Sequence, residues 1–168
     1  MIKVYDNGIL IFNGKNYHCS FGKNGFTKNK YEGDKMTPMG IFLLGDLYIR
    51  RDKINNIKTD FKIINIKKNM VWCDAPTKKK YNTLISSYNN QRESLYRNDN
   101  LYDIILVIKY NMNPVIPYKG SAIFIHNINK KYEPTNGCIA LKASDLLNIL
   151  SDLKPSDKIN ITTAKNIN

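Results

Sequence analysis

The sequence predicts a mainly β protein, and three features of its 168 residues support that prediction. The apolar runs are short and rich in Ile, Val, Tyr and Phe. Asn-Gly pairs, prolines and polar stretches separate them, as turns separate neighbouring strands. One segment near the C-terminus has apolar residues at clear helical spacing. We therefore expect strands to dominate, with one clear helix.

Length and composition indicate one folded domain. A chain of 168 residues is long enough for one hydrophobic core and short for two. Apolar residues make up 42% and charged residues 24% of the chain, which is typical of a globular protein. We expect a single domain over residues 1–163 and a polar tail at 164–168.

The N-terminal half is expected to form a hairpin, a long loop and further strands. Ile9–Phe12 and Tyr17–Phe21 flank Asn13-Gly14, a pair that tolerates the positive φ of a tight hairpin turn. Residues 21–37 are polar and glycine-rich, and loops of this length are often functional. Residues 74–90 are predicted to be mostly loop. Further strands are predicted at Gly40–Leu44, Phe61–Ile66 and Met70–Cys73.

The C-terminal half is expected to contain the buried strands and the helix. Tyr102–Tyr110 is apolar on both alternating faces, which predicts a central strand buried on each side. Ala122–His126 is a second buried strand, and Lys158–Thr162 is the last one. Ser144 is expected to cap the helix and Pro155 to end it. The apolar face of the helix consists of Leu146, Ile149, Leu150 and Leu153.

The chain is strongly basic, with 26 Lys and Arg against 14 Asp and Glu and a formal net charge of +12 at pH 7. Such a charge favours anionic surfaces. The cations are dispersed, however, and the longest basic run, Lys78–Lys80, has no aromatic ladder or recognition motif beside it. Specific nucleic-acid binding is therefore not expected.

The lengths of the apolar runs and the cysteine positions argue against a membrane span, a signal peptide, a disulfide framework and a zinc site. No run is long enough for a signal-peptide core or a membrane span, so the sequence, taken as complete, predicts a cytoplasmic protein. The three cysteines, at positions 19, 73 and 138, include no CxxC pair. We expect neither a disulfide framework nor a zinc site, and no other cofactor. No pattern in the sequence specifies an oligomeric state.

The segment Gly120–Leu141 has the pattern of a cysteine nucleophile. A buried strand leads to His126, a polar loop of eleven residues follows, and the chain returns to Cys138. A nearby imidazole that takes the thiol proton supplies the nucleophilic thiolate. Gly137 allows a tight turn, and its amide and that of Cys138 can face a developing oxyanion. We predict that Cys138 is the nucleophile and His126 its base.

The same segment resembles the signature of the L,D-transpeptidase catalytic domain, also called the YkuD domain, in which a His precedes a [Ser/Thr]-x-Gly-Cys-apolar element. Residues 135–139, Thr-Asn-Gly-Cys-Ile, match that element in order, with His126 upstream. The commonest signature has a second His where this chain has Asn136 and a polar residue where this chain has Ala140. Its spacing between the first His and the Cys is also longer than that from His126 to Cys138. Blocks that resemble one bacterial branch of the family lie at 21–44, 71–76, 81–85, 95–111 and 120–126.

The resemblance implies a β-sandwich or distorted barrel with one or two short helices and a groove over the cysteine. Cys138 would attack the amide that follows the L-centred diamino acid of a peptidoglycan stem tetrapeptide, expel the terminal D-amino acid and form a thioester. An amine acceptor would then give an L,D cross-link, and water would give L,D-carboxypeptidase activity. The implied partners are stem peptides or muropeptides, and the implied location is the periplasm or cell wall.

Two other classes of function remain open: a non-catalytic cell-wall-binding domain and a cysteine hydrolase of unrelated peptides. Glu32 and Asp34 can contact a cationic part of a substrate or simply form a turn. His18 and Cys73 are interpreted as structural. The further candidates for substrate or oxyanion contacts are Gly137, Asn136, Thr135, Tyr102, Arg97 and Trp72, of which Trp72 fits a core position as well.

Overall fold

The computed structural model describes residues 1–87, 93–128 and 131–164. Its one helix in these ranges, α1, spans Ala143–Asp152. The strands are β1 Ile2–Tyr5, β2 Ile9–Phe12, β3 Lys15–His18, β4 Phe26–Thr27, β5 Thr37–Pro38, β6 Gly40–Ile49, β7 Ile63–Asn65, β8 Met70–Trp72, β9 Leu84–Ser86, β10 Glu93–Ser94, β11 Ile104–Ile108, β12 Phe124–Asn127, β13 Ile139–Leu141 and β14 Lys158–Thr162.

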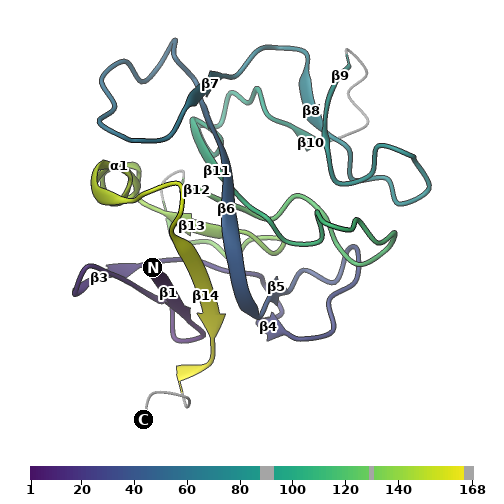
Figure 1. Ribbon diagram of the computed structural model, residues 1–168, viewed down its shortest axis with the longest axis horizontal. Coiled ribbons are helices and arrows are strands. Elements are labelled where there is room, and N and C mark those ends of the chain that lie inside the picture. The colour runs from purple at the N-terminus through teal and green to yellow at the C-terminus, as the bar shows by residue number, and fades with distance from the viewer. Residues whose placement is uncertain (88–92, 129–130, 165–168) are drawn as a thin grey trace.

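One large sheet curves into a nearly closed barrel (Figure 1), with the strand order β13-β12-β11-β6-β14-β1-β2-β3 and β7 beside β6. The chain after β3 narrows the remaining gap, because Ser20 pairs with Ala140 of β13 and Gly22 pairs with Thr135. Two small sheets, β10-β8-β9 and β4-β5, lie outside this path. The prediction of a mainly β, distorted barrel with a helix is confirmed.

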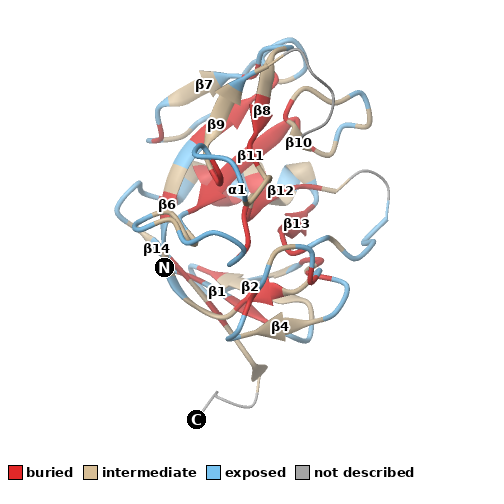
Figure 2. Ribbon diagram, turned by 90° about the vertical axis from the view of Figure 1, so that its right-hand side faces the viewer, coloured by how far each residue is buried: buried red, intermediate tan, exposed pale blue. Residues whose placement is uncertain are grey.

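The central strands β11 and β12 are buried on both faces, as Figure 2 shows in red. Leu106 and Ile125 face the larger core, which includes the apolar side of α1. Ile105 and Phe124 face a second core, which also contains Cys138. This double burial confirms the prediction for the run around β11, and it places the cysteine on the face opposite the helix.

The N-terminal hairpin differs in part from the prediction. Its turn lies at Asn13-Gly14, with φ of 48° and 73°. The second strand is nevertheless β3 and not Tyr17–Phe21, because the tight turn pairs Phe12 directly with Lys15. The residues after β3 leave the hairpin to pair with β13. Strand β1 was missed from the sequence and pairs in parallel with β14.

Several element boundaries also required correction. β12 begins at Phe124, because Ala122 has φ of 53°, which a strand does not accommodate. Ser144 is not the helix cap: the residue before α1 is Lys142, and no side chain caps that end. The helix ends before Pro155, as predicted. Within 74–87, β9 interrupts the predicted loop. Residues 88–90 of the predicted loop and residues 165–168 of the predicted tail lie outside the described residues.

No helix in the described parts of the chain is long and apolar enough to cross a membrane, since α1 has only ten residues. The prediction of a single domain over 1–163 remains a prediction.

Candidate functional site

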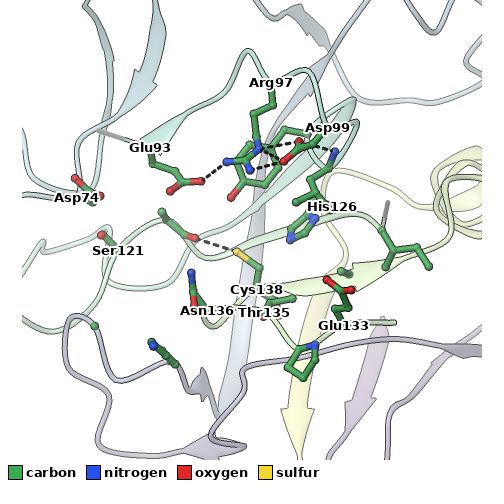
Figure 3. Close-up of a pocket in the computed structure, with 18 of the residues that line it drawn as sticks. Asp74, Glu93, Arg97, Asp99, Ser121, His126, Glu133, Thr135, Asn136 and Cys138 are labelled. Atoms are coloured by element: carbon green, nitrogen blue, oxygen red, sulfur yellow. Dashed lines mark hydrogen bonds and ion pairs between the residues drawn. The ribbon is translucent and has the colours of Figure 1, made fainter. Parts of the chain in front are cut away.

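Two neighbouring strands bring the predicted nucleophile and base to one face. β13 runs parallel to β12, with Ala140 opposite His126. Cys138 lies two positions before Ala140, so its side chain leaves on the same face as those of Ala140 and His126. Figure 3 shows Cys138 and His126 among the side chains that line one cavity. The parallel pairing of two short strands therefore assembles the pair.

A cavity of about 790 Å³ opens over these side chains. Cys138 is 8% exposed and His126 is 5% exposed, so both reactive groups are shielded from bulk water. The predicted site residues that line this cavity are Cys138, His126, Thr135, Asn136, Tyr102 and Arg97.

Backbone groups before and within β12 hold the thiol. The S–H of Cys138 donates to the carbonyl of Ala122 at 3.2 Å, and the N–H of Phe124 donates to the sulfur at 3.4 Å. An amide donor directed at sulfur stabilises a thiolate. A carbonyl acceptor stabilises the thiol instead. The S–H must therefore turn away from Ala122 before it can transfer its proton to an imidazole.

Cys138 and His126 are both neutral at rest. Burial raises the pKa of the Cys138 thiol from 9.0 to about 12, and the Phe124 amide offsets part of this rise. Burial also lowers the pKa of His126 from 6.5 to about 4, while hydrogen bonds with the backbone of Asn127 and Leu101 act in the opposite direction. Between those two values the pair consists of a thiol and a neutral imidazole. Such an imidazole acts as a general base during attack.

This resting state predicts the pH dependence of Cys138 alkylation. The native rate with iodoacetamide should change little between about pH 6 and pH 9, because the neutral imidazole takes the thiol proton during attack. In His126→Ala, which lacks that base, the rate should be lower near neutral pH and rise about tenfold per pH unit, because the thiolate fraction grows by that factor below the thiol pKa. Mass spectrometry of the peptide that contains Cys138 measures the initial rates. A native rate that rises tenfold per pH unit, as in His126→Ala, would contradict the role of His126 as the base.

The imidazole is held from two sides. Nδ1 of His126 forms a hydrogen bond with the carbonyl oxygen of Asn127 at 2.9 Å, which assigns the proton of the neutral ring to Nδ1, since a carbonyl oxygen only accepts. The ring of Tyr102 packs edge to face against His126, with centroids 5.1 Å apart. The guanidinium of Arg97 lies 5.2 Å from the centroid of the Tyr102 ring.

The positive charge of Arg97 is already balanced by carboxylates. The guanidinium donates hydrogen bonds to both carboxylate oxygens of Asp99 and forms an ion pair with Glu93 at 3.7 Å. Figure 3 shows this group above the reactive pair. Arg97 and Tyr102 therefore support His126 through packing. A substrate carboxylate would have to compete with Asp99 for Arg97.

The turn before the nucleophile requires a glycine. Gly137 has φ of 134°, and a Cβ at this position would lie 2.8 Å from the carbonyl oxygen of Met36. Its N–H donates to Oγ1 of Thr135 at 3.1 Å, and that hydroxyl donates to the carbonyl of Cys138 at 2.6 Å. The expectation that the Gly137 amide faces an oxyanion is thus corrected, because Thr135 already accepts from it. The Cys138 amide is left for that role.

Trp72 does not line the cavity, so its proposed contact with substrate is also corrected. It is 3% exposed, packs against Phe124 with centroids 5.0 Å apart, and donates from Nε1 to Oδ1 of Asn82 at 2.9 Å. This position in the second core supports β12 from behind.

Glu32 and Asp34 have different positions. Glu32 lines the cavity and accepts hydrogen bonds from the hydroxyls of Tyr81 and Ser121. Asp34 is buried and accepts from Nζ of Lys30 at 2.6 Å, so it matches the turn-forming interpretation. His18, at the exposed end of β3, is not among the residues that line the cavity.

Sequence reasoning did not identify several residues around the pair. Ser121, Glu93, Asp99 and Lys30 line the cavity, and Thr37 binds the Gly137 carbonyl. Thr37, Asp99 and Ser121 fall in blocks that resemble the family, and this was the available signal. Nothing in the local pattern distinguishes them from loop residues.

The cavity is more acidic than the rest of the chain. Five carboxylates and four cationic side chains are among the described residues that line it, whereas the whole chain carries +12. Two of those cations are paired, Lys30 with Asp34 and Arg97 with Asp99. The basic excess therefore lies elsewhere on the protein. Within 1–87, 93–128 and 131–164, no group of three or more His, Cys, Asp or Glu side chains is arranged to hold a metal ion.

Comparison with known proteins gives a family match over most of the chain. The profile of the L,D-transpeptidase catalytic domain, YkuD, matches residues 1–161. Comparison with curated proteins gives no match. An L,D-transpeptidase from Mycobacterium smegmatis is similar in structure, with 11% identity, a TM-score of 0.42, and coverage of 96% of this chain and 57% of that one. The helical cell shape determining protein Pgp2 from Campylobacter jejuni has 15% identity, a TM-score of 0.42, and coverage of 96% and 46%. The chain thus spans about half the length of these structures.

Proposed function

Since this chain belongs to the L,D-transpeptidase catalytic-domain family, we propose that it is a cysteine acyl-transferase that acts on peptidoglycan stem tetrapeptides. The observation that carries the proposal is that Cys138 and His126 line one cavity, inside a domain that the family profile matches from residue 1 to 161. The acidic lining of the cavity favours an enzyme over a polyanion-binding domain at this place.

The proposed reaction begins when His126 takes the proton of Cys138. The sulfur attacks the carbonyl carbon that follows the L-centred diamino acid, and a C–S bond forms as the carbonyl oxygen becomes an oxyanion. The oxyanion then collapses, the C–N bond breaks, and the proton on His126 passes to the departing amine of the terminal D-amino acid. The product on the enzyme is a thioester at Cys138.

The second half of the reaction releases the acyl group. We assign the acceptor as the amine of a neighbouring stem peptide, which gives an L,D cross-link. His126 takes a proton from that amine as it attacks the thioester, the C–S bond breaks, and His126 returns the proton to the departing sulfur of Cys138. Water in place of the amine gives the carboxypeptidase product with the same residues. The periplasm or cell wall is the proposed location, because cross-linking requires the assembled polymer.

Incubation with purified disaccharide tetrapeptides tests this function. We expect release of the terminal D-amino acid and formation of a dimer, read by mass spectrometry. Tripeptide without dimer would assign the hydrolytic reaction. Unchanged tetrapeptide, from a folded protein whose Cys138 reacts with iodoacetamide, would contradict the proposed substrate. Fractionation of cells that express the native gene tests the location, and recovery in the cytoplasmic fraction alone would contradict it.

A further inference from the structure

Thr37 connects the long N-terminal loop to the nucleophile turn. Its Oγ1 donates to the carbonyl oxygen of Gly137 at 2.9 Å and accepts from the N–H of Gly22 at 2.8 Å. The residue is 0% exposed and is not among those that line the cavity. Thr37 therefore contacts the peptide group that carries the Cys138 amide and is too deep to touch a substrate.

The bond to Gly137 fixes the direction of the next amide. In a trans peptide the C=O and N–H groups point in opposite directions across one plane. Because the Gly137 carbonyl is directed at Thr37, the N–H of Cys138 points away from Thr37. Gly137, with φ of 134°, would otherwise allow this plane to rotate over a wide range.

A buried ion pair holds Thr37 in place. Nζ of Lys30 donates to Oδ1 of Asp34 at 2.6 Å and to the carbonyl of Met36 at 2.9 Å. Asp34 also accepts from the N–H of Met36 at 2.9 Å. The side chains of the pair are 4% and 1% exposed. Met36 is thus fixed at both its amide and its carbonyl, directly before Thr37.

We propose that Thr37 is a positioning residue that sets the Gly137–Cys138 peptide plane so that the Cys138 N–H donates to the acyl oxyanion. The proposal deepens the proposed function and rests on it for the peptide substrate. In the acylation step the C–S bond forms and the carbonyl π electrons move to oxygen. The Cys138 N–H stabilises that charge only if its direction is already fixed, since a rotating dipole would have to be reoriented at a free-energy cost.

Thr37→Val tests the proposal, because it keeps the branched shape and removes the hydroxyl. We expect kcat on the tetrapeptide to fall about 100-fold, as for loss of one oxyanion donor, with KM unchanged because Thr37 does not reach the substrate. Acylation by p-nitrophenyl acetate, followed as nitrophenolate release, should fall by a similar factor. Alkylation of Cys138 by iodoacetamide at pH 9 forms no oxyanion, so its rate should stay the same.

Two variants serve as matched controls. Thr37→Ser keeps the hydroxyl and should keep kcat close to that of the native protein. Thr27→Val removes a hydroxyl that accepts only from the nearby N–H of Asn29, as far as the described residues show, and should leave all three rates unchanged. Thermal unfolding checks that each variant is folded. If Thr37→Val does not fold, Thr37→Ala takes its place.

The outcomes separate this proposal from the proposed function. Alkylation that falls in parallel with acylation would overturn the proposal, because the thiol itself would then be disturbed. Equal losses of kcat in Thr37→Ser and Thr37→Val would overturn it too, and so would an unchanged acylation rate in Thr37→Val. Native protein that is acylated by the ester but leaves tetrapeptides intact would contradict the proposed substrate, while the ester still tests Thr37.

Discussion

Replacement of Cys138 by alanine or serine is expected to abolish acyl transfer and leave the fold intact. The sulfur forms the bond to the acyl group, and loss of a nucleophile of this kind lowers kcat by about 10⁴-fold or more. A small side chain should fit the position, and the serine hydroxyl can donate to the Ala122 carbonyl as the thiol does. Muropeptide turnover measures the activity, and thermal unfolding measures the fold.

The other two cysteines provide the controls for that prediction. Cys19→Ser and Cys73→Ser should retain turnover, since neither residue lines the cavity. Cys73→Ser should lower the unfolding temperature, because its side chain is 0% exposed and a hydroxyl there is harder to bury than a thiol. Full turnover in Cys138→Ala would assign the chemistry to another residue.

Gly137→Ala is expected to cause the second largest loss of activity. The new Cβ would lie 2.8 Å from the carbonyl oxygen of Met36, and φ of 134° is unfavourable for alanine. The peptide between residues 137 and 138 must shift, which misplaces both the sulfur and its amide. We expect kcat to fall by about 100-fold or more and the unfolding free energy to fall by about 1–3 kcal/mol.

Gly14→Ala is the matched control for the backbone strain. Gly14 also has a positive φ, of 73°, but a Cβ there has no atom within 4 Å. This variant should lose stability by a similar strain and keep its activity. Equal loss of activity in both variants, or normal activity in Gly137→Ala, would show that the shape of the nucleophile turn is not critical.

The sequence was sufficient to predict those parts of the site that depend on local pattern. His126 ends an apolar strand, and Gly137 directly precedes Cys138, so the reactive pair and its turn are visible in one segment. The central strand was predictable for the same reason, because Ile104–Ile108 is apolar on both faces.

Contacts between distant segments could not be predicted in this way. Thr37 and Gly137 are separated by 100 positions, and only the barrel closure brings them together. The Tyr17–Phe21 expectation failed for a related reason, since Ser20 pairs with Ala140 rather than with the hairpin. Trp72 was open to two interpretations because a single aromatic residue in a strand gives no sign of which face is covered.

The pKa values of the pair also depend on burial that the sequence does not show. A Cys and a His in one motif suggest a thiolate beside an imidazolium. In the folded chain both groups are almost fully covered, and burial favours the neutral form of each. The two groups therefore become charged only when the sulfur attacks the substrate.

Intact-mass measurement during turnover tests the thioester most directly. Native protein mixed with a disaccharide tetrapeptide and quenched in acid should carry one added acyl group, equal to the substrate less its terminal D-amino acid. Peptide mapping should place it on Cys138, and Cys138→Ala should show none. Tetrapeptide consumption without an acyl group on Cys138, or with one on Cys19 or Cys73, would contradict acyl transfer through this residue.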